Sequence, residues 1–294
     1  MAPRPILLVV LAACHAGGGE HRTLVALRDA CAPGQLWTGT ACAATTAGAA
    51  KVAEGKAALT RQDVDAAKLA LDAAAQAGPL DHATNVMLWE QRGIARAYVD
   101  DEPGASAAFD MLLALDPGHF LSYTLSPKAT FVFEKVRNQP RIAPAVDVSW
   151  EHGGRVGEPV PVDVEVIADP THLLARATLF LRTRGESAWR ATDLALGGSI
   201  DKRLLLPPIA AAKPVTVELY LRAYDDRGNE TLVWADPKAP REIPLRYDPP
   251  TPWWRRPWVI ATAGTLLAAA VGITVYELTI APPDTISGPV SVTR

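Results

Sequence analysis

The first half of the chain carries apolar residues at helical spacing. Between Thr46 and about Arg137 the sequence is dominated by alanine, leucine, lysine, glutamate and glutamine, which favour helices. Gly-Pro or Pro-Gly pairs interrupt the pattern at 78–79, 103–104 and 117–118. The segment 46–138 is therefore predicted to form a helical domain. Its expected helices cover about 46–60, 63–77, 82–99, 103–115 and 127–138.

After Pro140 apolar and polar residues alternate instead. In the run PVPVDVEV, Val160, Val162 and Val164 occupy every second position, as expected for a strand with one buried face. Such runs predict eight strands, at about 146–150, 160–166, 179–181, 189–196, 204–206, 215–224, 231–234 and 243–247. Because no helical period intervenes, 140–248 is predicted to be an antiparallel β-sandwich. The residues of the longest strand expected to face its core are Val215, Val217, Leu219, Leu221 and Ala223.

A third pattern, near the C-terminus, lacks charge altogether. The uncharged run from Trp258 to Tyr276 would span roughly 28 Å as a helix, close to the hydrocarbon thickness of a bilayer. We therefore expect a single transmembrane helix at 258–276, between a Pro/Trp linker at 249–257 and a tail at 277–294. A buried helix of a soluble domain is the alternative. The residues expected to anchor the helix at the interfaces are Trp253, Trp254, Arg255, Arg256, Trp258 and Tyr276.

The N-terminus has the features of an export signal. Arg4 precedes a short apolar run that ends in small residues before Cys14, and the run is too short to span a membrane. The tetrad Leu11-Ala12-Ala13-Cys14 resembles the bacterial lipobox. This resemblance implies a signal peptide at 1–13, a lipid on Cys14 and a flexible tether over 14–45. An ordinary signal peptide that happens to end at a cysteine is the alternative.

The other two cysteines form an even pair in the segment CAPGQLWTGTAC. Pro33-Gly34 and Gly39 are turn formers that can bring Cys31 and Cys42 together in an oxidising compartment. We therefore expect a structural disulfide between them. The sequence does not favour a metal site, because there is no second cysteine pair and the nearby histidines lack ligand spacing.

Small and large residues recur with one spacing in the helical half. They are Gly55, Ala67 and Leu71 in a first frame and Trp89, Gly93, Ala105 and Phe109 in a second. Together with Pro117 the second frame resembles a tetratricopeptide repeat, although the first frame has Lys51 in place of the tryptophan. The resemblance implies paired helices, packed through these residues, that present a surface to partner proteins. A plain helical spacer is the alternative.

The strand half resembles an immunoglobulin-like domain in the run VTVELYLRAYDDRGNE. This resemblance concerns the fold and implies no activity. Asp225, Asp226, Asn229 and Glu230 suggest calcium as one interpretation, but these residue types are also those of ordinary turns.

Charge and motifs exclude several classes of function. The net charge is −3 and the pI about 6.1, with lysine and arginine scattered, so nucleic acid is not expected as a partner. Nucleophile-elbow, zinc-protease and phosphate-loop motifs are missing, and the six histidines occur singly. We therefore expect no catalytic residues, metal or cofactor.

Together these observations predict a multidomain chain, α then β: a small tetratricopeptide-like array, an antiparallel β-sandwich and a transmembrane helix. It resembles bacterial envelope lipoproteins, with its soluble domains in the periplasm and its tail at 280–294 in the cytoplasm. The expected function is a non-enzymatic, membrane-anchored scaffold that binds an unidentified envelope protein through the helical domain. An envelope sensor of a cell-wall sugar or a metal, and an unrecognised enzyme, are the alternatives. Gly264, Ala268 and Gly272 further suggest a homodimer through the membrane helix.

Overall fold

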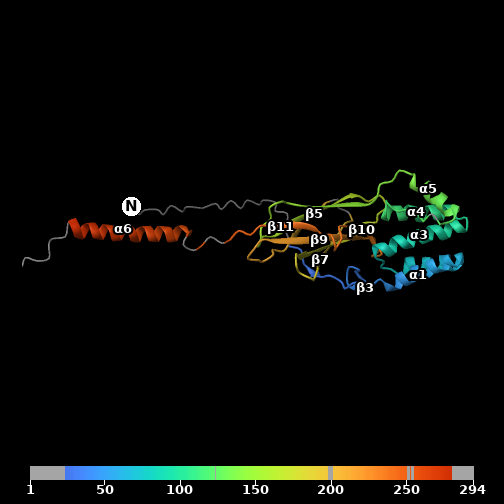
Figure 1. Cartoon of the computed structure of the whole chain (residues 1–294), viewed down its shortest axis with the longest axis horizontal. Coiled ribbons are helices and arrows are strands. Elements are labelled where there is room, and N and C mark those ends of the chain that lie inside the picture. Colours follow the sequence, from blue (N-terminus) through green and yellow to red (C-terminus); the bar gives the residue numbers. More distant parts are fainter. Residues whose placement is uncertain (1–23, 123, 198–200, 250–251, 253–254, 280–294) are drawn as a thin grey trace, which may run out of the picture. The chain divides into compact units, whose positions relative to one another are not determined.

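The computed structural model describes residues 24–122, 124–197, 201–249, 252 and 255–279. It divides into two compact units, Met1–Tyr247 and Asp248–Arg294, which are described separately below. Figure 1 follows the elements in chain order. Three short strands precede the helices within the larger unit, and the remaining antiparallel strands follow them, so the predicted order of α then β is confirmed from residue 46 onward.

Five helices form the first part of the larger unit. They are α1 (Thr46–Thr60), α2 (Val64–Gln76), α3 (His82–Tyr98), α4 (Glu102–Leu115) and α5 (Pro127–Arg137). Side chains cap four of them: Asp63, Asp81, Asp101 and Ser126 each accept a hydrogen bond from a backbone N–H of the first turn. These caps satisfy amides that would otherwise lack a partner, and this explains where the helices begin.

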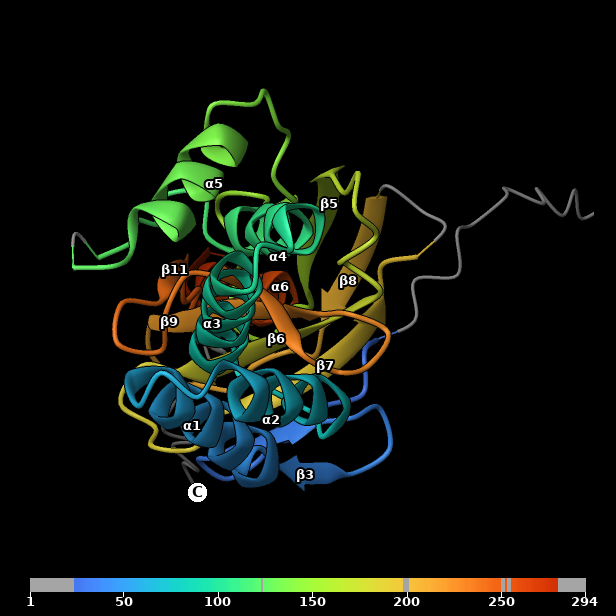
Figure 2. The same ribbon diagram turned by 90° about the vertical axis from the view of Figure 1, so that its right-hand side faces the viewer.

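The helices stack around α3. It packs against α1 and α2 on one side and against α4 and α5 on the other (Figure 2). Glycine allows the close approach: a Cβ added to Gly55 would lie 2.5 Å from the Leu71 side chain, and one added to Gly93 would lie 2.3 Å from the Phe109 ring. The same contact therefore occurs twice, between α1 and α2 and between α3 and α4. Phe109 also meets the edge of Phe133 on α5, with ring centroids 5.4 Å apart.

The second part of the larger unit contains two antiparallel sheets. The smaller sheet has the order β4 (Ala145–Trp150), β5 (Val160–Ala168), β8 (Asp201–Leu206). The larger has the order β1 (Arg28–Asp29), β7 (Arg190–Ala195), β6 (Arg176–Thr183), β9 (Val215–Tyr224), β10 (Glu230–Trp234). The last strand, β11 (Arg241–Leu245), pairs with the first half of β9, whereas β10 pairs with its second half.

One hydrophobic core joins the two sheets. Val162 and Val164 of the smaller sheet and Leu179, Leu219 and Leu221 of the larger belong to one buried cluster. Alternate residues of β6 and β9 therefore face this core, and the residues between them face the opposite side of the larger sheet. Burying each of these side chains contributes about 1.5–3 kcal/mol.

Residues 24–45 are ordered against the sandwich, in contrast to the tether expected over 14–45. Val25 and Leu27 pack on its core, and β1 extends the larger sheet by pairing with β7. Strands β2 (Gln35–Trp37) and β3 (Cys42–Ala44) then form a hairpin. The predicted disulfide is confirmed, because Cys31 and Cys42 are bonded with their Cα atoms 5.7 Å apart. The apolar Val25 and Leu27 explain why this segment docks.

A polar seam joins the helices to the larger sheet. The Leu80 amide donates to the side-chain oxygen of Asn229 at 3.0 Å, and the Leu80 carbonyl accepts from the Glu230 amide at 2.8 Å. The His82 amide donates to the Glu230 carboxylate, and the Asn85 side chain donates to the Glu230 carbonyl, both at 3.0 Å. The start of α3 is thus held by the turn before β10.

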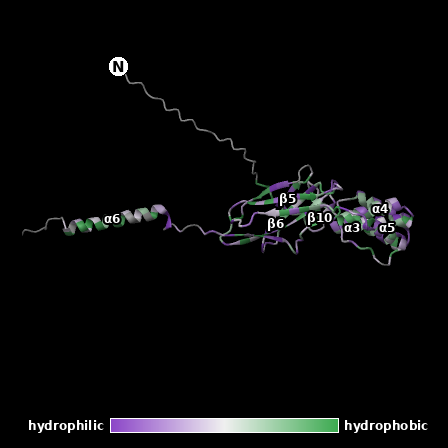
Figure 3. Cartoon of the chain, turned by 90° about the horizontal axis from the view of Figure 1, so that it is seen from above, coloured by the Kyte–Doolittle hydropathy of each residue, from purple (hydrophilic) through white to green (hydrophobic). Residues whose placement is uncertain are grey.

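The smaller unit contains α6 (Pro257–Thr279). Among the described residues no helix is long and apolar enough to cross a membrane, which overturns the predicted transmembrane helix at 258–276. That prediction relied on the lack of charge between Trp258 and Tyr276, a run that also contains the polar residues Thr262, Thr265 and Thr274. Figure 3 shows hydrophobic and less hydrophobic positions mixed along α6. Self-association through Gly264, Ala268 and Gly272 stays a prediction.

Candidate functional site

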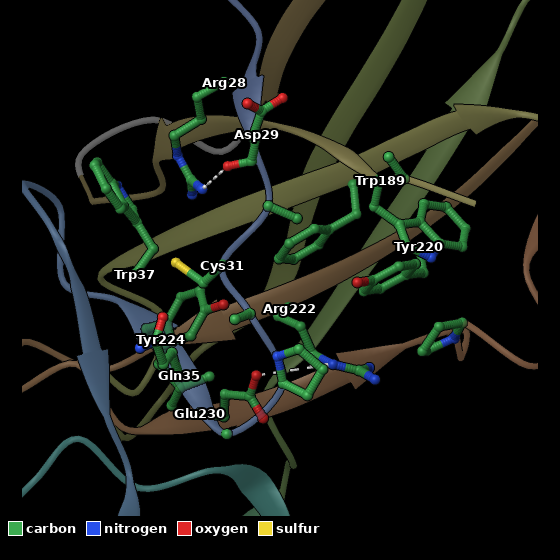
Figure 4. Close-up of a pocket in the computed structure, with 18 of the residues that line it drawn as sticks. Arg28, Asp29, Cys31, Gln35, Trp37, Trp189, Tyr220, Arg222, Tyr224 and Glu230 are labelled. Atoms are coloured by element: carbon green, nitrogen blue, oxygen red, sulfur yellow. Dashed lines mark hydrogen bonds and ion pairs between the residues drawn. The ribbon is translucent and has the colours of Figure 1, made fainter. Parts of the chain in front are cut away.

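A cavity of about 540 Å³ lies between the disulfide hairpin and the larger sheet. Residues 31–37 line it from the hairpin side; Phe180 of β6 and Tyr220, Arg222 and Tyr224 of β9 line it from the sheet. Figure 4 shows Trp37 and Cys31 on one side of the cavity and Trp189 and Tyr220 on the other. The sheet residues alternate with core residues, so the cavity lies on the face opposite the core.

Aromatic rings cover the sheet side of the cavity. Phe180 stacks on Tyr220 with ring centroids 4.5 Å apart and planes 7° from parallel. The ring of Trp189 meets Tyr220 at 4.7 Å and 81°. These three rings form one rigid surface, because stacked and edge-to-face contacts are the favoured arrangements of aromatic pairs.

Each charged residue that lines the cavity has an oppositely charged neighbour. Arg28 pairs with Asp193 at 2.8 Å, and Asp29 lies 3.6 Å from Arg190. The third pair lies within the cavity wall. There Arg222 Nε is 3.9 Å from Glu230, and Arg222 also stands over the Tyr220 ring at 5.2 Å. The lining therefore offers polar atoms but no uncompensated charge.

Burial shifts the pKa values of three groups at this site. Burial raises the pKa of Glu230 above its usual value, and the hydrogen bond from the His82 amide and the charge of Arg222 oppose the rise. Burial likewise raises the pKa of Tyr220 to about 12 and that of Tyr224 above its usual range. Both phenols are thus neutral hydrogen-bonding groups at physiological pH.

Two polar groups of β2 lie at the hairpin wall. Gln35 is exposed there, so its amide is accessible as both donor and acceptor. The indole N–H of Trp37 is buried and has no acceptor among the described residues. The guanidinium of Arg28 covers the Trp37 ring at 4.1 Å.

A second recessed surface, of about 520 Å³, lies on the helical domain. We call it the helical groove; α1, α3 and the loop before α5 line it. Its residues are Lys56, Leu59, Thr60, Met87, Glu90, Gln91, Ile94, Tyr98, Ser122, Thr124 and Leu125. Met87 is 37% exposed and Ile94 is buried, and the other lining residues are mostly polar, so the groove has an apolar floor and polar edges.

The structure places the residues singled out in the sequence in different environments. Gly55, Ala67, Leu71, Gly93, Ala105 and Phe109 are buried between helices and do not line the helical groove. Trp89 is half-buried and donates to the Asn85 side chain at 3.0 Å. Arg255, Arg256, Trp258 and Tyr276 belong to the smaller unit, whereas Cys14, Trp253 and Trp254 lie outside the described residues.

The acidic turn that begins at Asp225, for which the sequence suggested calcium as one interpretation, is held by its own hydrogen bonds. The Asp225 carboxylate accepts from the backbone amides of Arg227 and Asn229 at 2.9 and 2.8 Å, and from the Asn229 side chain at 2.9 Å. Across the described part of the chain, no three His, Cys, Asp or Glu residues gather as metal ligands. Asp225 is thus engaged as the turn former that the sequence also suggested.

Sequence reasoning missed the aromatic cavity. Its signal was present in β6 and β9, where Phe180, Tyr220 and Tyr224 occupy the positions between core residues. Such outward positions usually carry polar residues, so aromatic residues there mark a covered or binding face. The hairpin that covers them is far away in sequence, and no local pattern connects the two.

Comparison with known proteins identifies no family. No family model matches the chain, and no curated protein matches it. Among solved structures, the chain is similar to the "Cohesin module from Clostridium perfringens ATCC13124 family 33 glycoside hydrolase". The identity is 11% and the TM-score 0.24, and the match covers 36% of this chain and 98% of that chain.

The resemblance to an envelope lipoprotein with tetratricopeptide repeats, an immunoglobulin-like domain and a membrane helix is therefore wrong. No repeat family matches, and no membrane-spanning helix is found in the described residues. Glycine opposite a large side chain, which suggested the repeats, is what any two closely packed helices require. What the structure shows is coarser: a helical stack followed by two antiparallel sheets around one core.

Proposed function

We propose that this chain is a non-enzymatic adaptor that binds another protein through the helical groove. The observation that carries the proposal is the groove itself, because its apolar floor is accessible at the exposed Met87 and the half-buried Leu125 while polar side chains surround it. A recess of about 520 Å³ falls within the usual range of binding sites.

An extended segment of a partner protein fits this surface best. Lys56 and Glu90 supply one charge of each sign at the edges, so the groove selects neither a strongly acidic nor a strongly basic partner. The exposed hydroxyl groups of Ser122 and Thr124 can pair with a peptide backbone, since a hydroxyl offers both a donor and an acceptor. Apolar side chains of the partner would then pack on the floor at Leu125 and Met87.

We also propose that the adaptor works in an oxidising compartment outside the cytoplasm. The support is the Cys31–Cys42 disulfide, because such bonds persist where thiols are not kept reduced. The disulfide closes the hairpin, and Val25 and Leu27 pack the preceding segment on the sandwich, so any soluble fragment used in binding experiments has to begin at or before residue 24.

Site-specific crosslinking tests the proposal. A photo-crosslinking amino acid placed at position 87 in the full chain should capture a partner, whereas the same group at the exposed position 69 on α2 should not. The captured protein, once purified, should bind the wild type and lose at least tenfold affinity for Met87→Glu. The matched control Leu69→Glu should bind normally, since Leu69 is 76% exposed and does not line the groove. Equal crosslinking at both positions, or full binding by Met87→Glu, would refute the proposal.

A further inference from the structure

The aromatic cavity between the disulfide hairpin and the larger sheet combines flat rings with a balanced set of charges. Phe180 stacks on Tyr220, and the hairpin contributes Trp37 from the other side. Its volume of about 540 Å³ and its mostly apolar walls are those of a small-molecule site. The charges then decide which class of molecule the cavity can take.

An anionic ligand does not suit this cavity. Arg28 is engaged by both oxygens of Asp193, at 2.9 and 2.8 Å, and Arg222 faces both Glu230 and Asp236 within 4 Å. A phosphate or carboxylate would have to displace one of these acidic partners. Phosphate-containing ligands are therefore disfavoured, even though aromatic rings and arginines occur together here.

A cationic ligand is disfavoured for a different reason. Organic cations bind over aromatic faces, but the faces of Trp37, Trp189 and Tyr220 already carry Arg28, Arg182 and Arg222, at 4.1, 4.2 and 5.2 Å. A further cation would meet like charge at each ring. The remaining class is a neutral molecule with both an apolar face and many polar groups.

We propose that this cavity binds a neutral oligosaccharide. One face of a sugar ring is lined by C–H groups and can pack on the half-buried ring of Phe180, and its hydroxyl groups can pair with polar atoms at the rim. Gln35 offers an exposed amide on the hairpin, and the Trp37 side chain adds apolar surface to the same wall. Glu230 and Arg222 offer an acceptor and a donor on the sheet side.

Titration calorimetry of the full chain with neutral trisaccharides tests the proposal. The probes are cellotriose, chitotriose and maltotriose, with inorganic phosphate and choline as the anionic and cationic comparisons. At least one trisaccharide should bind in the millimolar range or tighter, and it should change the fluorescence of the tryptophans at the cavity. Phosphate and choline should not bind at the same concentrations.

Variants at the hairpin wall connect binding to the cavity. Gln35→Ala should weaken binding about fivefold, the worth of one neutral hydrogen bond, and Trp37→Ala about tenfold. The matched control Gln139→Ala, at an exposed position that does not line the cavity, should bind as the wild type does. If Trp37→Ala does not fold, Gln35→Ala still tests the proposal, because Gln35 is exposed and its substitution should not disturb the fold.

Three outcomes would overturn the proposal. They are binding of no trisaccharide at millimolar concentration, binding of phosphate or choline instead, and trisaccharide binding that Gln35→Ala leaves unchanged. The experiment is independent of the adaptor proposal, because the aromatic cavity and the helical groove share no residue. Failure of one therefore leaves the other standing.

Discussion

The carboxylate of Glu230 accepts a hydrogen bond from the backbone N–H of His82 at 3.0 Å, which places a buried acid of the larger sheet at the first residue of α3. The positive end of a helix stabilises an acceptor at this place. Glu230 also lines the aromatic cavity, where Arg222 lies 3.9 Å away. One side chain thus contacts both the helical domain and the proposed ligand site.

The raised pKa of Glu230 makes stability depend on pH. An acid with a folded pKa above its unfolded value contributes stability at pH values below the unfolded pKa of about 4.5, and this contribution is lost as pH rises through the folded pKa. Replacing Glu230 by glutamine keeps an acceptor for the His82 amide but removes the titration. The melting temperature of the wild type should therefore fall as pH rises above about 4.5. In Glu230→Gln this fall should be smaller.

Thermal unfolding between pH 4 and pH 8 measures this effect. The control is Glu165→Gln, at an exposed position of β5, which should retain the pH profile of the wild type. A Glu230→Gln variant whose melting temperature falls with pH as steeply as that of the wild type would contradict the assignment of this titration to Glu230.

The seam between helices and sheet should depend on Asn229 as well. Its side-chain oxygen accepts from the buried Leu80 amide at 3.0 Å, so Asn229→Ala leaves that amide without a partner. We expect a loss of about 1–3 kcal/mol in the free energy of unfolding, measured by urea denaturation. Asn138→Ala, at the exposed C-terminal end of α5, should cost less than about 0.5 kcal/mol. Equal effects of the two substitutions would show that the seam contributes little.

Much of the fold could be predicted from the sequence because the signals were local. The caps Asp63, Asp81 and Asp101 and the alternation along β5 and β9 each act within a few residues. The disulfide was predictable from turn residues and parity. The cavity was not, because it joins the 31–37 hairpin to strands about 150–190 residues later in the chain. The seam was not either, since its polar residues resemble those of any turn.

Close packing at Gly93 gives a sharp prediction within the helical domain. Alanine there would place its Cβ 2.3 Å from the Phe109 ring, which is itself fully buried. Although alanine favours helix by about 1 kcal/mol over glycine, we expect Gly93→Ala to be destabilising by about 1–3 kcal/mol from overpacking. Gly93→Ala should therefore cost less stability in the Phe109→Leu background than in the wild type, because the smaller leucine leaves room for the added methyl group. Additive effects in this double-mutant cycle would argue against direct contact.

The disulfide should affect both stability and the proposed ligand site. Cys31 and the residues up to Trp37 form the hairpin wall of the aromatic cavity, and the bond to Cys42 closes a short loop. In the chain-entropy model a loop of this size stabilises by about 3 kcal/mol. We therefore expect the Cys31→Ser/Cys42→Ser variant to unfold at lower urea concentration and to bind the best trisaccharide more weakly. The stability effect follows from the unfolded chain, whereas the binding effect requires the hairpin to be part of the site.

Thiol titration of unfolded, non-reduced wild-type protein should detect neither cysteine, and two reactive thiols in this pair would contradict the disulfide. If the serine variant is destabilised but binds the sugar with unchanged affinity, the disulfide has a structural role only. That result would also show that the hairpin is not part of the ligand site.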